Sequence, residues 1–568
     1  MEDSNQEHRK LWFATQLWTW GCAAVFLFLT LPLAFERPSG GRSAERQGFT
    51  AGIIRMYCHN PSHSILKGPQ IHFGNNPFNL EYTGFEWLQG VLARGLGGTE
   101  CEGAVEKIGK SVSIWFSAAS LLVLGALSFA LAQLVGIATP FALIGSAVSV
   151  FLLACDELWL RYATYTMVEN RMLFFALVAL YGSVRTEAGS KAGMARYVWP
   201  LIAGSAWAMT GVHKPQGFAF FAVFWTVFLA IRWRIQGIAP SVRGILALGT
   251  GSLVVVGWLA WGHVLGQASD LPWILHTGPR ATRWYFGNWS ERFEPKFFTS
   301  NLLKWAQQTG IFLVLPALAV LSIFFRRPVK AWALKFAQVA VPYGIALFVF
   351  VFLFWAVYIV HEYYALPFDV GRALATGIAL ALLAEVVLGT IDKHHRLLAL
   401  ALAVLVTAVC GTAYRKGVPP YLAYAARIND PRAPDYLHGW NEQVFPERHP
   451  FVVMTVRSRG SELLYLYKAK ARGFVWCTHN PIHAPRKYWK DQGVRWVAWG
   501  EPSPDPATPG LYQWTVRSIE QELELARKNN WSSDVDDHWA GRTMAQWAAH
   551  ASSNGKDPCL DNPDPRSW

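Results

Sequence analysis

The run Ser111–Gly136 reads SVSIWFSAASLLVLGALSFALAQLVG and contains no Asp, Glu, Lys or Arg. About 20 apolar residues in an α-helix span the hydrocarbon core of a bilayer, so this run predicts a transmembrane helix. Further runs of that length or slightly less recur up to Cys410, and we expect about eleven spans in all. The others are Leu11–Phe35, Thr139–Ala154, Met172–Val184, Tyr197–Val212, Phe218–Ile231, Ile245–Leu265, Trp305–Phe325, Phe336–Tyr358, Val370–Ile391 and Leu397–Cys410.

The composition agrees with a membrane protein. Hydrophobic residues make up 52% of the 568 residues and charged residues only 16%, against roughly 25% charged in soluble proteins. These figures exclude an intrinsically disordered chain, a collagen-like fibre and a small disulfide scaffold, and they argue strongly against a wholly soluble protein.

The placement of the basic residues predicts the orientation. Short cytoplasmic loops carry an excess of Lys and Arg, so the N-terminus is expected in the cytoplasm of a multi-pass protein of the plasma (inner) membrane. Because much of the net charge of +13 belongs to these loops, nucleic acid is not an expected partner. The basic residues of the cytoplasmic loops are Arg185, Lys191, Arg196, Arg232, Arg234, Arg243, Arg326, Arg327, Lys330, Lys335, Lys393 and Arg396.

A polar tail follows the last span. We expect residues 1–412 to form the membrane domain and residues 413–568 a soluble domain outside the cytoplasm. Strand-like runs at Phe451–Val456 and Val494–Trp499, with a helical run at Glu462–Lys470 between them, predict a small α/β fold for that domain.

The seven cysteines show no metal-ligand spacing, so no metal site is expected and no cofactor is assigned. Four of them fall on the non-cytoplasmic side, where an oxidising compartment permits disulfides. We expect the pairs Cys58–Cys101 and Cys477–Cys559.

The first non-cytoplasmic loop, residues 36–110, is too long for a simple connector. It contains an amphipathic helical run at Arg46–Arg55, and the segment Asn79–Leu88 leads into a second helix at the membrane surface. Glu81 and Glu86 lie among aromatic residues there. Either these helices lie in the interface with their acids in water, or the acids belong to a site.

Other polar residues occupy short breaks between spans. Glu169 precedes an apolar helix, where it either caps the helix or serves as a second acid. Lys214 lies between two spans with almost no loop, so it either snorkels to the boundary or binds a phosphate. His361-Glu362-Tyr363-Tyr364 fills another such turn; an aromatic belt explains its tyrosines but not its His–Glu pair.

All these residues map to one side of the membrane. A carboxylate can remove a proton from an attacking hydroxyl, and a cation can neutralise a departing phosphate. The combination at a lipid boundary favours group transfer from a lipid-linked phosphate donor.

Several stretches, taken in order, resemble landmarks of one family, the polytopic GT-C glycosyltransferases, in the branch of protein O-mannosyltransferases and aminoarabinose lipid A transferases. The resemblance implies a GT-C-like helical fold and transfer, usually with inversion, from a polyprenyl-phosphate sugar on the non-cytoplasmic side. These landmarks are Arg46–Arg55, Leu80–Leu88, Met167–Tyr181, His213–Pro215 and His361–Tyr364, and Leu463–Phe474 is similar to the family's tail domain.

One position departs from the family pattern. Members usually carry the acid presumed to be the catalytic base in the first loop, where this chain has Phe49. Three interpretations follow: Glu81 or Glu45 is the base, the register of the comparison is wrong, or the chain has lost transferase activity. The first is the working hypothesis.

The sequence therefore predicts a glycosyltransferase, hexosyl or pentosyl, acting on a glycan, lipid or protein acceptor among the membrane lipids. Glu81 or Glu45 activates the acceptor, and Glu169 orients the sugar or shares that role. Lys214 and Arg55 bind the donor phosphate. The alternatives are a transporter or flippase for a lipid-linked sugar and a non-catalytic assembly subunit. The residues expected to complete the binding site are His361, Glu362, Tyr363 and Tyr364.

Overall fold

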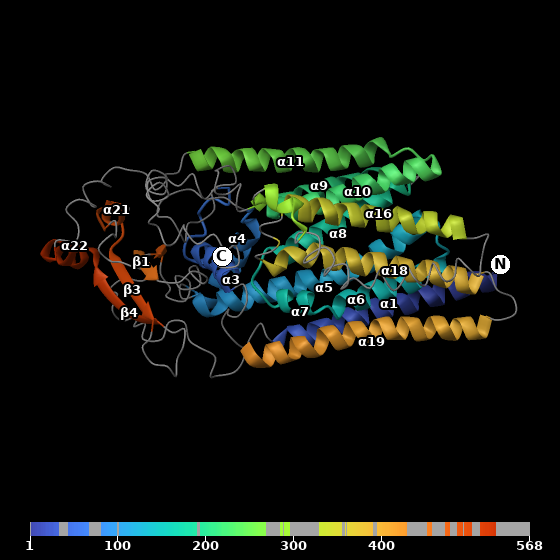
Figure 1. Cartoon of the computed structure of the whole chain (residues 1–568), viewed down its shortest axis with the longest axis horizontal. Coiled ribbons are helices and arrows are strands. Elements are labelled where there is room, and N and C mark those ends of the chain that lie inside the picture. Colours follow the sequence, from blue (N-terminus) through green and yellow to red (C-terminus); the bar gives the residue numbers. More distant parts are fainter. Residues whose placement is uncertain are drawn as a thin grey trace.

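A computed structural model gives the architecture, with a bundle of long helices and a small sheet domain beyond one end of it (Figure 1). The described residues are 2–32, 44–66, 81–98, 101–189, 194–267, 285–287, 289–295, 329–354, 358, 361–389, 395–428, 451–456, 472–477, 486–491, 493–502 and 512–529.

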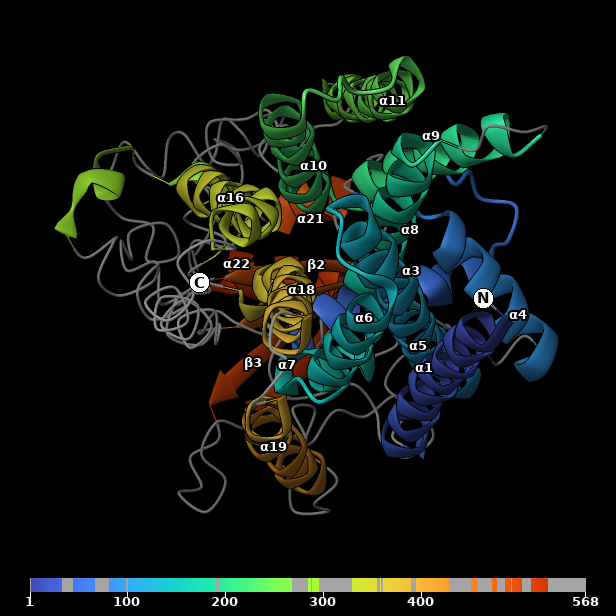
Figure 2. The ribbon, with the colours of Figure 1, turned by 90° about the vertical axis from the view of Figure 1, so that its right-hand side faces the viewer.

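Ten long helices form the bundle within the described residues. Figure 2 shows them seen along their common direction. Their bounds are α1 Glu2–Thr30, α5 Glu102–Leu134, α6 Thr139–Ala154, α8 Glu169–Glu187, α9 Ala195–His213, α10 Pro215–Gln236, α11 Val242–Gln267, α16 Val329–Leu353, α18 Leu366–Gly389 and α19 His395–Ile428.

These helices confirm the predicted class, a multi-pass helical membrane protein. Every predicted span lies largely within one of them except Trp305–Phe325, which is outside the described residues. Among the described residues, seven helices are long and apolar enough to cross a bilayer; α6 and α7 (Glu157–Ala163), bent by 62°, form an eighth candidate. The predicted spans Met172–Val184 and Tyr197–Val212, in α8 and α9, are not among those seven.

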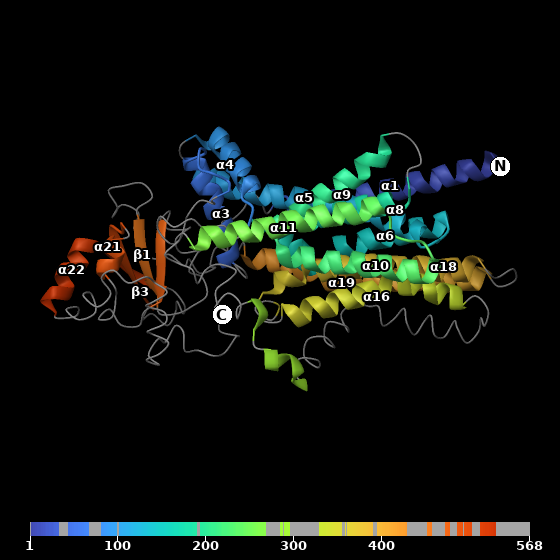
Figure 3. The same cartoon turned by 90° about the horizontal axis from the view of Figure 1, so that it is seen from above.

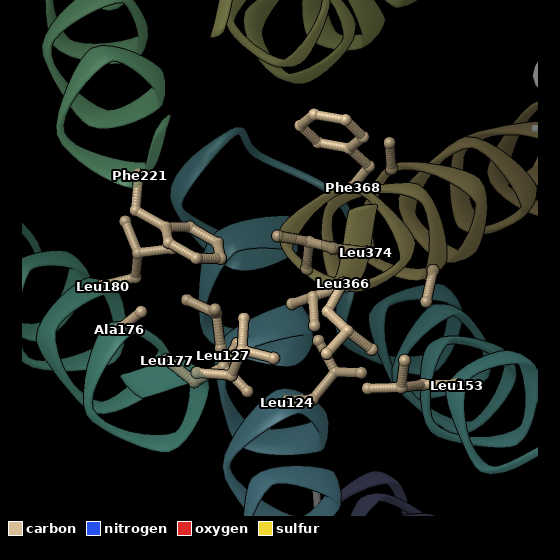
Figure 4. Packing of buried hydrophobic residues seen from close by; sticks show 14 of the residues in the cluster. Leu124, Leu127, Leu153, Ala176, Leu177, Leu180, Phe221, Leu366, Phe368 and Leu374 are labelled. Carbon is tan, nitrogen blue, oxygen red and sulfur yellow. The ribbon is translucent and has the colours of Figure 1, made fainter. Parts of the chain in front are cut away.

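Apolar side chains from most of these helices fill the centre of the bundle. Leu124 and Leu127 of α5 pack beside Leu177 of α8 and Leu366 of α18, as Figure 4 shows. Glycines allow α6 and α18 to approach closely, since a Cβ on Gly145 would lie 2.7 Å from the Gly377 carbonyl oxygen. Close-packed interiors leave no room for such an atom, so these contacts fix the bundle that carries the site.

The described part of the first loop forms two helices at the end of the bundle. Its helices are α3 (Ala44–His59) and α4 (Gly84–Gly97), and we call residues 44–66 and 81–98 the loop unit. The predicted disulfide Cys58–Cys101 is confirmed and ties α3 to the start of α5. Ala51, Ile54 and Ala93 pack around it and bury it from solvent.

The tail contains a four-stranded sheet in the order β2-β1-β3-β4. The strand β1 pairs in parallel with β2 and β3, and β4 pairs antiparallel with β3. The predicted strands are confirmed as β1 and β3, whereas the helical run Glu462–Lys470 and Cys559, the expected partner of Cys477, lie outside the described residues. The elements are β1 Phe451–Val456, β2 Arg472–Cys477, α21 Arg486–Asp491, β3 Trp496–Pro502, β4 Tyr512–Ser518 and α22 Ile519–Lys528.

The last helix of the bundle is longer than the sequence suggested. The predicted span Leu397–Cys410 lies inside α19, which continues to Ile428. The chain is therefore still helical where we predicted the boundary between residues 412 and 413.

Removal of the Cys58–Cys101 disulfide tests whether this bond stabilises the loop unit. We expect Cys58→Ser to lower the midpoint of thermal unfolding by a few degrees, because loss of a native disulfide typically costs about 2–5 kcal/mol. Cys410→Ser, at a cysteine that forms no disulfide in the structure, is the control and should leave the midpoint nearly unchanged. Equal midpoints of thermal unfolding for both variants would contradict the conclusion that the disulfide stabilises the loop unit.

Candidate functional site

Lys214 lies in a break between two helices. The helix α9 ends at His213, and α10 begins at Pro215, leaving Lys214 in extended backbone with φ −153° and ψ 99°. A proline disfavours helical backbone in the residue before it and is well suited to the first position of a helix. The sequence Lys214-Pro215 therefore produces the break, which turns the lysine side chain into the protein.

The ammonium group of Lys214 contacts two carboxylates from distant parts of the chain. Its Nζ lies 3.1 Å from Glu81 Oε1 and 3.0 Å from Glu169 Oε1. The side chains of Lys214, Glu81 and Glu169 are 9%, 13% and 3% exposed. Partly buried ion pairs are screened far less than surface pairs. Together the three groups carry a net charge of −1, and we call them the lysine cluster.

Backbone contacts bring both acids to the lysine. The Tyr82 amide donates to the Val212 carbonyl at 2.9 Å, which fixes Glu81 beside the end of α9. Glu169 is the first residue of α8, where the helix dipole favours a negative charge. Glu169 makes no capping hydrogen bond, since Val168 is the N-cap of α8. Its carboxylate contacts Lys214 beside the first-loop acid Glu81 instead, as the interpretation of a second acid facing the loop predicts.

Aromatic rings cover the other side of the ammonium. Lys214 Nζ lies 5.5 Å from the ring centroid of Tyr363 and 5.0 Å from that of Tyr364, within the range of cation–π attraction. His361 stacks on Tyr363 with ring centroids 5.0 Å apart. The short helix η4 (Glu362–Ala365) thus brings Tyr363 and Tyr364 to the lysine cluster, and His361 directly precedes it.

Glu362 is engaged elsewhere. Its Oε2 accepts a hydrogen bond of 2.9 Å from Arg161 Nη1, and Arg161 also pairs with Glu157 on α7. Arg161 lies over the ring of Tyr424 on α19 at 5.0 Å. The sequence analysis missed Arg161, although the spacing of Glu157 and Arg161 by four residues on a helix is a signal for such a pair.

A second buried ion pair fastens the loop unit to the bundle. Arg171 of α8 forms a salt bridge with Glu86 of α4, and the two side chains are 1% and 4% exposed. The interpretation that places the loop acids in water is therefore wrong for Glu86. His213 lies nearby, between the rings of Phe85 and Phe175, with Nδ1 bonded to the Met209 carbonyl at 2.7 Å.

The remaining predicted residues belong to α3. Phe49 is 7% exposed and packs with Ile53 and Tyr57, so it belongs to the apolar core of the loop unit. Arg55 is 2% exposed within the same helix. Glu45 lies in α3, but its side chain is outside the described part of the structure.

The side chain of Tyr57, in the loop unit, is buried from water. Its hydroxyl lies 2.6 Å from the hydroxyl of Thr83, two residues after Glu81. Burial disfavours the phenolate and raises the pKa of Tyr57 to about 12. The hydroxyl is therefore protonated at neutral pH and holds Thr83, which positions the segment that carries Glu81.

No metal centre is evident in the portion of the chain that the structure describes, because no three His, Cys, Asp or Glu side chains there are grouped to hold an ion.

Comparison with known proteins identifies the fold. The family model described as dolichyl-phosphate-mannose-protein mannosyltransferase matches residues 89–264, a region that includes Glu169 and Lys214. Among curated protein sequences, none matches this chain significantly.

Three solved structures are similar to the chain. ArnT from Cupriavidus metallidurans bound to undecaprenyl phosphate gives a TM-score of 0.52 at 13% identity, covering 88% of this chain and 98% of that one. Its apo state gives 0.50 at 13% identity with the same coverage. AglB from Archaeoglobus fulgidus, in complex with an inhibitory peptide and a dolichol-phosphate, gives 0.48 at 12% identity, covering 85% of this chain and 69% of that one.

The ArnT similarity shows the fold. The chain shares the helical architecture of ArnT, in agreement with the fold that the resemblance in its sequence implies.

The buried pair Glu86–Arg171 makes a quantitative prediction about stability. Arg171→Met should destabilise the protein by about 3–5 kcal/mol, because it leaves Glu86 as an uncompensated buried charge. Lys490→Met is a matched control, since Lys490 pairs with Glu520 on the surface at 48% and 63% exposure and such pairs contribute about 0–1 kcal/mol. Thermal unfolding of both variants measures the difference, and equal midpoints would show that the buried pair contributes nothing.

Proposed function

We propose that this protein is a membrane glycosyltransferase that uses a polyprenyl-phosphate sugar as donor. The observation that carries the proposal is the lysine cluster, in which Glu81 and Glu169 meet around Lys214 at the end of the bundle beside the loop unit. The ArnT fold and the mannosyltransferase family model support it. ArnT has been crystallised with undecaprenyl phosphate, which is the chemical class of carrier that we propose here.

Glu81 is the proposed catalytic base. At 13% exposed it is the more accessible of the two acids, whereas Glu169 is 3% exposed. In the proposed step, the carboxylate of Glu81 takes the proton of an acceptor hydroxyl as the oxygen forms a bond to the anomeric carbon of the sugar. The bond from that carbon to the phosphate oxygen breaks, and polyprenyl phosphate leaves. Attack opposite the phosphate inverts the anomeric centre.

Lys214 has a positioning role in this proposal. Because its ammonium already contacts two carboxylates, it holds Glu81 and Glu169 close together against their mutual repulsion. Binding of the donor phosphate by Lys214 requires the phosphate to share that ammonium with the acids. Arg55 remains a proposed phosphate ligand, and His361 with the two tyrosines of η4 is proposed to shape the pocket.

The proposed location follows from the sequence. The basic connections place the N-terminus in the cytoplasm and the lysine cluster on the opposite face of the plasma (inner) membrane. The proposed donor carries a hexose or a pentose, and the proposed acceptor is a glycan, a lipid or a protein.

Phe49 supports a second candidate, a non-catalytic assembly subunit. Phe49 is buried with Ile53 and Tyr57, and if it stands where the family usually has its acid, that position serves packing in this chain. Under this alternative the purified protein binds the donor without turning it over.

An activity assay that includes a substitution of the proposed base distinguishes the glycosyltransferase from the non-catalytic assembly subunit. In an assay with purified protein and a polyprenyl-phosphate sugar, Glu81→Gln should lower the rate of transfer by about 10²–10⁴-fold, the usual contribution of a general base. Glu524→Gln, at an exposed acid of the tail, is the control and should retain full activity.

Two results would contradict the proposal. Full activity of Glu81→Gln would remove Glu81 from the mechanism and leave Glu169 and Glu45 as candidates. Inactivity of the unmodified protein, with donor binding intact, would favour the assembly subunit.

A further inference from the structure

Two arginines share one aromatic ring at the start of α9. Arg196 Cζ lies 5.9 Å from the ring centroid of Tyr197. Arg243 Cζ, from the first turn of α11, lies 5.7 Å from the same centroid. Both distances are within the range of cation–π attraction, but two cations held near one ring also repel each other. We call Arg196, Tyr197 and Arg243 the arginine site.

The packing of α9 against α11 produces this arrangement. Gly204 of α9 faces Ala247 of α11, since a Cβ on Gly204 would lie 3.4 Å from the Ala247 carbonyl oxygen. Tyr197 precedes Gly204 by two helical turns, and Arg243 precedes Ala247 by one turn. Residues with these spacings lie on the same face of a helix. Contact between two helices therefore positions the arginine site.

The protein supplies no acid to these two arginines among the residues that the structure describes. There, Arg196 and Arg243 contact the ring of Tyr197 without a hydrogen bond or an ion pair. The acid close to them, Glu187, is engaged by other groups. Its two carboxylate oxygens each accept a hydrogen bond of 3.1 Å from the Ser241 amide, and Oε2 lies 3.6 Å from Arg232 Nη1. The arginine site thus keeps its positive charge.

The surface around the site is exposed and apolar. Tyr197 is 60% exposed, and Leu201, one turn further along α9, is 69% exposed. Leu246 of α11, one turn beyond Arg243, is 62% exposed. This surface combines cationic groups at the helix starts with apolar side chains one turn further along.

The arginine site lies at the edge of the membrane. The candidate span of α11 begins at Val242, directly before Arg243, and spans begin where lipid meets water. Figure 3 shows the starts of α9 and α11 on the side of the bundle away from the sheet domain, which is also the side of the N-terminus. Lipid headgroups lie at this level, and acyl chains lie at the level of the leucines.

We propose that the arginine site binds the headgroup phosphate of an anionic phospholipid, in the leaflet on the side of the N-terminus. Guanidinium groups form strong, charge-assisted hydrogen bonds with phosphate oxygens, and basic sites between membrane helices suit anionic headgroups. A phosphate bound by both cations offsets their mutual repulsion. The acyl chains of the lipid lie along Leu201 and Leu246. The inference does not depend on the proposed enzymatic activity.

Native mass spectrometry of the full chain tests the proposal. Delipidated protein in detergent is titrated with phosphatidylglycerol, which is anionic, or with phosphatidylcholine, which has no net charge. The unmodified protein should bind its first phosphatidylglycerol about 25-fold more tightly than phosphatidylcholine, because a basic residue near a lipid headgroup contributes about 5-fold. The double variant R196Q/R243Q should lose this preference.

Two further variants serve as controls. Arg234→Gln removes the same charge from an exposed arginine in the last turn of α10, on the same side of the membrane, and it should keep the preference for phosphatidylglycerol. The double variant R196K/R243K keeps both charges and should keep most of the preference. If R196Q/R243Q is not monodisperse, each single variant should show a loss of about 5-fold.

Three results would overturn the proposal. The first is equal affinity of the unmodified protein for the two lipids. The second is a loss with Arg234→Gln as large as that with R196Q or R243Q alone, which would show a general effect of positive charge. The third is displacement of phosphatidylglycerol by an equal concentration of glycerol 3-phosphate, which has the phosphate but no acyl chains and would show a site for soluble phosphates.

Discussion

The structure of the site depends on one buried cation. Lys214 joins the part of the first loop just before α4, the start of α8 and the junction of α9 with α10, because each segment supplies a group to its ammonium or carries it. Two carboxylates in a region of low dielectric repel each other. An ammonium between them attracts both, and this attraction holds together the segments that carry them. If the lysine were lost, the attraction that draws Glu81 and Glu169 toward one ammonium would be lost with it.

Two further ionic contacts fasten the elements that carry the lysine cluster and its aromatic neighbours. The pair Glu86–Arg171 attaches the loop unit to α8. Arg161 connects α7 with η4 and with the C-terminal part of α19. Charged residues are costly near a bilayer unless they are paired. The pairs lie among the starts and ends of spans, where water and protein replace lipid, and they hold the loop unit beside the cluster.

The sequence predicted the architecture well because apolar run length and turn chemistry are local signals. It also predicted that Glu81, Glu169, Lys214, His361 and the tyrosines share one side, and the structure brings them together. It did not predict that Lys214 contacts both acids, or that Glu86 is buried with Arg171. Those facts depend on how α4 and α8 pack, which no periodicity within either segment reveals. Arg161 was missed for the same reason, since two of its partners, Glu362 and Tyr424, lie more than 200 residues away.

A structure of the protein with a bound polyprenyl-phosphate sugar, at a resolution that shows side chains, tests the central claim most directly. The account predicts that Lys214 still contacts Glu169. It also predicts that the carboxylate of Glu81 lies on the face of the anomeric carbon opposite the phosphate, where it can accept a hydrogen bond from an attacking acceptor hydroxyl. An anomeric carbon bound far from the lysine cluster, or Glu81 and Glu169 on separate sides of the membrane, would contradict it.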